Sequence, residues 1–359
     1  MIRLAAPFAL LLLACQSSPT SVGKAEAWPE ADRLFHADPR WLGGDSAYSI
    51  DLGANRVLWL FGDSFIATGG GLTRAQSTLV HNSVAIQTGY DPTSAAMAFY
   101  WATRNGAPAS LFPEVGAEWL WPGHGARLGD RLILFFMRIK SDPGTLGFLT
   151  DAAKALLVDN PDDPPTQWIT HPIALPPNGF GVLLGAGGCT VLGAFLDCFS
   201  PVEPGNHDIY LIRWAVADAM IGNLSRPDWY AGPAGWVAGS SLTERPPPIF
   251  TGGQTELSVH FDSLTRRFIE VQTDGFGGAN LATRDALLLE GAWSPLETLF
   301  RPLESNNPNT LVYSAKAHPE LSGGATAITY CTNNTDWNAL LNDPNIYFPR
   351  FVKLTLMAR

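Results

Sequence analysis

The sequence is poor in charge, and this shortage excludes one class of partner. Only 16% of the 359 residues are charged, and the 23 basic residues form no run. Together with a formal net charge of −10, this excludes a nucleic-acid partner, because phosphate backbones are bound by clustered Lys and Arg. With 46% hydrophobic residues, the chain is expected instead to fold around a large core.

Cysteine and histidine are also scarce, with four and seven residues. No pair of them has the spacing of metal ligands, so we expect neither a metal nor another cofactor. The glycines at 69–71 precede neither a helix nor a Lys-Ser/Thr pair, which excludes a phosphate-binding loop.

The only long apolar run lies at the start of the chain. The stretch "MIRLAAPFALLLLACQSS" has a basic Arg3, a run of signal-peptide length and a small residue before Cys15. It is too short to span a bilayer in a mature protein. "LLAC" resembles the lipobox of bacterial lipoproteins, which implies lipidation of Cys15, while an ordinary secretory signal is the alternative. Gln16 after the cysteine favours the outer membrane by the same resemblance.

These features predict three segments: a lipoprotein signal peptide at 1–14, a flexible tether at 15–30 and one folded domain at 31–359. We expect a monomer that is attached to the membrane by its lipid anchor only. In an oxidising compartment, Cys189 and Cys198 could form a disulfide, because they flank "TVLGAFLD", a hairpin centred near Gly193. Small buried hydrophobic residues are the alternative reading of the cysteines.

Helical periodicity is limited to 151–159 and 338–343, and strand-like runs dominate. They are short, rich in β-branched and aromatic residues, and punctuated by 35 glycines and 28 prolines. The strands fall into five clusters, which begin near residues 46, 125, 181, 255 and 325. The predicted fold is all-β, a five-bladed β-propeller, with an irregular β-sandwich as the alternative. We favour the propeller because "VHFDSLTRRFIEV" is similar to the strand-turn-strand of sugar-binding blade families.

Two Gly-Asp-Ser triplets carry the main candidate site residues, Asp45 and Asp63. Between them lie two strand-like runs, 47–52 and 57–61, joined by the turn-forming "GAN" at 53–55. The turn is centred near residue 54, and 45 and 63 are equidistant from it, so antiparallel pairing brings the two aspartates to the same edge. Two facing carboxyl groups suit glycoside hydrolysis, with one as acid and the other as base or nucleophile. The alternative is that each aspartate closes an Asx-turn.

Inner strands of a propeller begin near its axis, so residues just ahead of them line one funnel. This rule predicts substrate-binding residues ahead of the first strand of three clusters. They are His124 for the second cluster, Glu256 for the fourth, and His318 with Glu320 for the fifth, with Asn82 added because it precedes a strand next to His81. Structural roles, as a backbone-bonded loop histidine, an ion pair or a turn residue, are the alternatives. Trp119, Trp121, Tyr230 and Trp236 are candidates for stacking on sugar rings, although most of the 12 tryptophans must pack between sheets.

The runs "GGDSAYSIDL", "LWLFGDSF", "HNSVAIQTG" and "KAHPELSGGATAITYCTNN" resemble five-bladed propeller proteins long called a domain of unknown function. That group includes the endo-D-arabinanases of glycoside hydrolase family 183, and the resemblance covers most of residues 30–357. It implies an inverting mechanism with Asp45 and Asp63 as the catalytic pair, which we assign as base and acid respectively. The expected function is hydrolysis of a polysaccharide, such as an arabinan-type furanoside. The alternative is a non-catalytic carbohydrate-binding lipoprotein of the cell surface.

Overall fold

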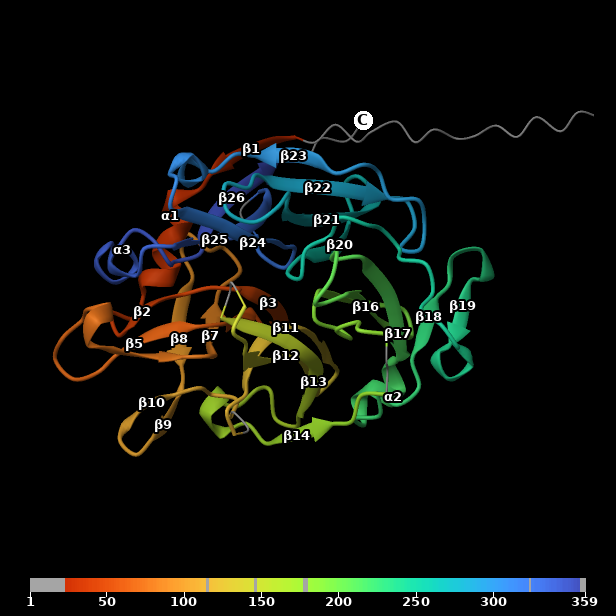
Figure 1. The fold of residues 1–359 in the computed structure, drawn as a ribbon, viewed down its shortest axis with the longest axis horizontal. Helices are drawn as coiled ribbons and strands as arrows, with labels where there is room; N and C mark the ends of the chain where they lie inside the picture. Colours follow the sequence, from red (N-terminus) through yellow and green to blue (C-terminus); the bar gives the residue numbers. More distant parts are fainter. Residues whose placement is uncertain (1–22, 114–115, 145–146, 177–179, 323, 356–359) are drawn as a thin grey trace, which may run out of the picture.

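The computed structural model describes residues 23–113, 116–144, 147–176, 180–322 and 324–355. The fold is mostly β, and five sheets of four or five antiparallel strands make up its body. Figure 1 shows these sheets following one another around the middle of the molecule. Cys15 and the predicted signal peptide lie outside the described residues. None of the helices in the described ranges is long and apolar enough to cross a bilayer.

The first three sheets follow chain order. The first sheet consists of β3 (Tyr48–Gly53), β4 (Arg56–Phe61), β7 (Ser83–Thr88) and β8 (Ala96–Tyr100). The second consists of β11 (Trp119–Leu128), β12 (Arg131–Ser141), β13 (Phe148–Val158) and β14 (Thr170–Ile173). The third consists of β15 (Gly188–Leu192), β16 (Phe195–Pro201), β17 (Ile209–Ala215), β18 (Asp228–Tyr230) and β19 (Trp236–Ala238).

The last of the five sheets joins the two ends of the described chain. The fourth sheet consists of β20 (Ser258–Asp262), β21 (Arg267–Thr273), β22 (Leu281–Ala286) and β23 (Glu297–Phe300). The fifth has the order β1 (Lys24–Ala27), β26 (Arg350–Thr355), β25 (Thr326–Asn334) and β24 (Thr310–His318). Its outer strand β1 pairs with β26, so the N-terminal segment forms the edge of the sheet next to the C-terminal strand.

Smaller elements decorate the first and last sheets. A three-stranded sheet contains β2 (Trp41–Gly44), β5 (Ser64–Ala67) and β6 (Ser77–Val80), and a hairpin contains β9 (Ala102–Arg104) and β10 (Ala107–Ala109). The α-helices of the described residues are α1 (Pro29–Asp32), α2 (Val216–Met220) and α3 (Trp337–Asn342). The predicted helix at 338–343 is therefore confirmed as α3, which begins after Asp336, whose carboxylate accepts backbone N–H bonds at the helix start.

Two predictions for local structure were wrong. Within the predicted helix at 151–159, residues 151–158 are part of the strand β13, because its backbone pairs with both β12 and β14 and this ladder overrides the helix propensity of Ala, Leu and Lys. Residues 24–30 of the predicted tether form β1 and the start of α1, because β1 completes the edge of the fifth sheet.

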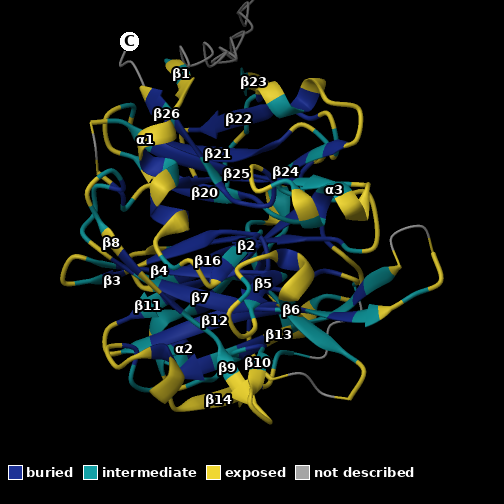
Figure 2. Ribbon diagram, turned by 90° about the vertical axis from the view of Figure 1, so that its left-hand side faces the viewer, coloured by how far each residue is buried: buried dark blue, intermediate teal, exposed yellow. Residues whose placement is uncertain are grey.

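The core lies between neighbouring sheets. Tyr48 and Leu60 of the first sheet pack with Leu134 of the second, and Phe135 of the second packs with Trp214 of the third. Similar clusters join the third sheet to the fourth and the fourth to the fifth, and Trp59 with Phe351 joins the fifth to the first. Figure 2 shows that most residues of the central strands are buried, whereas most residues of the connecting loops are exposed.

The first strands of neighbouring sheets meet near the centre. Along the ring, β3 contacts β11, β11 contacts β15, β15 contacts β20, and β20 contacts β24. The ring returns to β3 through Ser49 Oγ, which lies 2.6 Å from His318 Nδ1 of β24. In the fifth sheet the strand at the centre is therefore β24. The sequence pattern predicted the later strand, 326–334, at the centre and therefore predicted that the residues just ahead of it line the funnel.

Candidate active site

The two aspartates lie on one long hairpin that is broken in its middle. Tyr48 pairs with Leu60 in the lower part, and Gly44 pairs with Ser64 beyond the break. Both pairs are centred on residue 54, so the register continues through the break and brings Asp45 and Asp63 to opposite positions. Gly62 N also donates to Asp45 O at 3.2 Å across the gap. The predicted hairpin, with the two aspartates on one edge, is confirmed.

Backbone strain marks the break. Ser46 and Ala47, directly after Asp45, have φ angles of 65° and 53° in the left-handed region, which non-glycine residues rarely adopt. The pairing register also shifts between Trp41 and Gly44. The strand therefore turns sharply at Asp45, and the carboxyl group of Asp45 lies over Gly62.

Asp45 accepts hydrogen bonds from two tyrosines. Tyr313 OH donates to Oδ2 at 2.7 Å, and Tyr347 OH donates to the same atom at 3.4 Å. Burial, followed by the negative charges of Asp63 and Glu256, raises the pKa of Asp45 to about 8, against the opposing effects of the Tyr313 hydrogen bond and the charge of Lys316. Asp45 is therefore protonated at neutral pH, although part of its surface stays accessible.

Asp63 has different partners, from the first and second sheets. Trp121 Nε1 donates to Asp63 Oδ1 at 2.7 Å, and His81 Nδ1 lies 2.8 Å from the same oxygen. The imidazole of His81 stacks on Trp119, with ring centroids 4.7 Å apart. Because an indole N–H can only donate, Asp63 Oδ1 is an acceptor. Trp121 therefore orients Asp63 directly, and Trp119 acts on Asp63 through the ring of His81.

A buried lysine that no sequence motif pointed to joins these groups. Lys316 lies in β24 with 1% of its side chain exposed, and its Nζ donates to Ser46 O at 2.6 Å and to Glu256 Oε1 at 3.2 Å. The ammonium group also lies 4.2 Å from the ring centroid of Tyr48. Lys316 holds the strained segment after Asp45 and brings Glu256 into the same cluster, while contact of Glu256 with a substrate stays a prediction.

The other predicted substrate-binding residues have structural partners. Asn82 is buried, and its amide bonds Phe112 N, Phe112 O and Leu120 O. His318 is fully buried, with Nδ1 on Ser49 Oγ and Nε2 on Thr329 Oγ1. The side-chain N and O atoms of both residues bond other parts of the protein, so a substrate-binding role for Asn82 and His318 stays a prediction without support from these contacts.

His124 and Glu320 both lie next to Ser49 of β3. His124 Nε2 donates to Ser49 O at 3.0 Å, and its Nδ1 accepts from Cys189 N at 2.8 Å. His124 is therefore a link between β3, β11 and β15, as in the alternative reading from the sequence. Glu320 follows β24, and burial raises its pKa, with Ser49 and His124 as neighbours. Neither side chain shares a contact with Asp45 or Asp63 in the described structure.

Cys189 and Cys198 are directly opposed in the β15–β16 hairpin, whose turn is formed at Gly193 with φ 59°. Their Sγ atoms are 2.7 Å apart and both side chains are buried. They stand as thiols in this structure, so the disulfide stays a prediction.

We expect the exported protein to contain this bond, because the register already brings the two sulfur atoms together. Peptide mapping without reduction should recover the segments of Cys189 and Cys198 as one linked species. Reduction should lower the free energy of unfolding by about 2–4 kcal/mol, the usual effect of a disulfide that closes a short loop. Two free thiols in protein isolated from an oxidising compartment would contradict the prediction.

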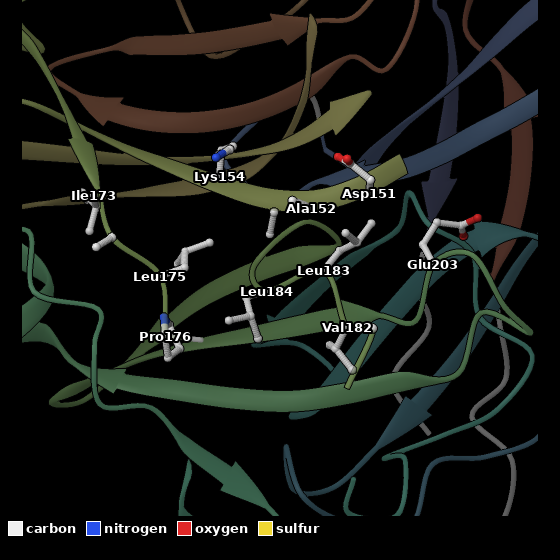
Figure 3. A pocket seen from close by; sticks show the side chains of 13 residues that line it. Asp151, Ala152, Lys154, Ile173, Leu175, Pro176, Val182, Leu183, Leu184 and Glu203 are labelled. Carbon is white, nitrogen blue, oxygen red and sulfur yellow. The ribbon is translucent and has the colours of Figure 1, made fainter. Parts of the chain in front are cut away.

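The described structure also contains a pocket away from these residues. Its volume is about 420 Å³, and it lies between β13 and the segment 181–184 (Figure 3). Asp151 and Lys154 lie on the β13 side, and Leu183 and Leu184 face them. Asp151 is already paired with Arg138 at 2.8 Å. None of the predicted site residues lines this pocket. No group of three or more His, Cys, Asp or Glu suited to a metal ion occurs in the described ranges.

Comparisons with known proteins agree with the all-β fold. Over 92% of this chain and 90% of the other, the structure superimposes with a TM-score of 0.71 and 16% identity on a crystal structure from Bacteroides ovatus ATCC 8483, described as a candidate hydrolase. A GH43 enzyme from Xanthomonas citri aligns over 92% of this chain and 97% of its own, at 10% identity and a TM-score of 0.47. An α-L-arabinofuranosidase from Podospora anserina, solved with cellotriose, aligns over 88% and 92%, at 13% identity and 0.47. The last two are too distant to bear on the fold or chemistry of this chain.

Sequence comparison reaches less far. No curated protein matches this chain. Residues 30–192 match a family model described as a domain of unknown function, DUF5005. The matched segment contains Asp45 and Asp63, while Glu256 and Lys316 lie outside it. The chain therefore has the fold of the Bacteroides ovatus protein, and its N-terminal part is similar to the DUF5005 domain.

Proposed function

We propose that this protein is a glycoside hydrolase that cleaves a polysaccharide, such as an arabinan-type furanoside, with Asp45 and Asp63 as its acid and base. The observation that carries the proposal is the chemical difference between two facing carboxyl groups. Asp45 keeps its proton at neutral pH, and Asp63 accepts hydrogen bonds from Trp121 and His81. A general acid and a general base require this difference.

These electrostatics favour the reverse of the roles expected from the sequence. Asp45 is the better acid because burial and two neighbouring carboxylates keep it protonated, so it can give its proton to the leaving oxygen. Asp63 is the better base, since its orientation by Trp121 prepares it to take a proton from water. Glu256 and Lys316 act on Asp45 through their charges.

The proposed mechanism inverts the anomeric centre. In a regular hairpin, opposed residues have Cβ atoms about 4.5–5.5 Å apart, which suits the short separation of a retaining pair. Here the strand is broken at Ser46 and Ala47, and the register shifts before Gly44. Such a break allows the carboxyl groups to separate towards the roughly 6.5–9.5 Å that accommodates the attacking water.

For the fold we propose a five-bladed β-propeller in which the five larger sheets are the blades. The ring of contacts among β3, β11, β15, β20 and β24 supports it, and so does the core between each pair of neighbouring sheets. The catalytic residues then lie at the entrance of the central funnel, where the first blade meets the second and fifth.

The function is tested by incubating the purified protein with a panel of arabinans, xylans and other polysaccharides and separating the products by chromatography. New reducing ends and shorter fragments are expected from at least one furanoside polymer. Binding without any product, across the panel and the pH range below, would favour the carbohydrate-binding lipoprotein instead.

The pH dependence provides a second test. Asp45 must be protonated to act as acid, so kcat/KM should fall as pH rises through about 8. Because the Tyr313 hydroxyl stabilises the ionised form of Asp45, Tyr313→Phe should raise the pKa of Asp45 and move the basic limb to higher pH. We would measure kcat/KM from pH 4 to about 10 for both proteins. A basic limb that stays in place would contradict the role of Asp45.

For location we propose a lipid anchor at Cys15 that holds a monomeric enzyme at the outer membrane of a bacterial cell envelope. The lipobox-like run supports it. Cys15→Ala should leave the protein unprocessed or soluble, as measured by fractionation of cells and immunoblotting. Membrane association that survives the substitution would contradict the proposal.

A further inference from the structure

An exposed aromatic residue stands close to Asp45. Phe276 lies in the loop between β21 and β22, with 61% of its side chain exposed. Single exposed apolar side chains are common on protein surfaces, so the contact of Phe276 with Tyr313, not its exposure alone, sets it apart. The hydrolytic roles proposed above leave Phe276 without a function.

The loop that carries Phe276 is tied at both ends. Asn280 N donates to Asp274 Oδ1 at 2.7 Å, Asn280 Nδ2 donates to Asp274 Oδ2 at 2.6 Å, and Asp274 N donates to Asn280 O at 3.0 Å. In the middle, Gly277 has φ 99° and its carbonyl accepts from Val312 N at 2.7 Å. The loop therefore holds Phe276 in a defined position against β24.

Phe276 is connected to Asp45 through a single residue. Its ring lies 5.4 Å from the ring of Tyr313, at 51°, and the Tyr313 hydroxyl donates to Asp45 Oδ2 at 2.7 Å. One ring is exposed while the other contacts the acid, so the two rings form a continuous aromatic surface that leads away from the reacting group.

We propose that Phe276 is the platform of a sugar-binding subsite beside Asp45, and that the substrate is a chain of sugars rather than a single one. The proposal rests on the proposed function. A sugar ring has an apolar C–H face that packs on an aromatic ring, while its hydroxyl groups remain in water. Because Tyr313 lies between Phe276 and Asp45, the ring that packs on Phe276 is a neighbour of the sugar that is cleaved.

The test compares Phe276→Ala with the conservative Phe276→Tyr and with Phe261→Ala. Phe261 is a matched control, because it is 49% exposed and packs on Phe268 at 5.3 Å, but lies at the far end of β20, next to the turn. Affinity electrophoresis in gels that contain linear arabinan measures binding without requiring turnover. Kinetics on the same polymer and on an aryl monoarabinofuranoside separates the subsite from the catalytic centre.

Phe276→Ala should weaken arabinan binding and raise KM on the polymer about 3- to 10-fold, the size of one aromatic contact. Its kcat/KM on the aryl monosaccharide should stay unchanged. Phe261→Ala and Phe276→Tyr should both keep the wild-type arabinan binding and the wild-type KM on the polymer. Wild-type affinity in Phe276→Ala, equal losses on polymer and monosaccharide, or no arabinan binding by the wild type would overturn the subsite. If the wild type binds arabinan through Phe276 but hydrolyses nothing, the subsite stands and the proposed hydrolase falls.

Discussion

Asp45→Asn and Asp63→Asn are each expected to lower kcat on a polysaccharide about 10²- to 10⁴-fold, the usual contribution of a general acid or base. Asparagine has nearly the same shape as aspartate, but it can neither donate the acid's proton nor accept one from water. The Tyr313 bond to residue 45 and the Trp121 bond to residue 63 can both form with the amide oxygen, so the fold should persist. Circular dichroism and thermal unfolding would check this.

The two substitutions should differ on an activated substrate. An aryl arabinofuranoside with a dinitrophenol leaving group needs no proton from the enzyme, so Asp45→Asn should recover much of its activity on it. Asp63→Asn should remain inactive, because the attacking water still needs a base. The opposite pattern would restore the assignment of Asp45 as base and Asp63 as acid.

Asp51→Asn is the matched control, since Asp51 belongs to the same hairpin but lies at its turn, where it accepts from Gly53 N and Tyr90 OH. Its activity should be close to that of the wild type. A folded Asp45→Asn or Asp63→Asn variant with near wild-type turnover on the polymer would make that aspartate structural, and the carbohydrate-binding reading would then lead.

Gly62→Ala is expected to lower kcat/KM about 10²-fold while the protein stays folded. A Cβ at residue 62 would lie 2.5 Å from Asp45 Oδ1 and 3.0 Å from Ser46 Oγ. To reach ordinary contact at 3.4 Å, the Asp45 carboxyl group must move by about 0.9 Å. Displacement of a reacting group by about 1 Å can cost two orders of magnitude in rate.

Gly70→Ala provides the comparison, because a Cβ there meets no atom within 4 Å. It should leave both kcat/KM and the midpoint of thermal unfolding unchanged. Full activity in Gly62→Ala, with the same thermal stability, would show that the carboxyl group of Asp45 does not need its position over Gly62.

The register of the hairpin that carries Asp45 and Asp63 could be read from the chain because it is a local property. Residues 47–52 and 57–61 are strand-like runs around a short turn, and a turn centred near residue 54 sets the register from Asp51–Val57 outwards to Asp45 and Asp63. The same reasoning holds for Cys189 opposite Cys198. Hairpin partners are close in sequence, so pattern and turn chemistry were sufficient.

The partners of the aspartates depended on contacts between distant segments. Tyr313, Lys316 and Tyr347 approach Asp45 only because the fifth sheet lies against the first, and nothing in their local sequence distinguishes them from core residues. The proposed roles of acid and base depend on that arrangement as well, since burial and neighbouring charges, not residue type, raise the pKa of Asp45.

The errors have the same origin. The segment 151–159 has the composition of a helix, but strands on both sides supply hydrogen bonds that the isolated segment lacks. His318 was expected in the funnel because the central strand of the fifth sheet was assigned one strand too late, and β24 instead buries it against Ser49. The sequence by itself determined the β-rich fold, the hairpin and the facing aspartates, through local alternation and turns. Only the tertiary structure decided which strand lies at the centre, which polar side chains are used up in the core and which aspartate keeps its proton, because burial and charge are properties of the packed sheets.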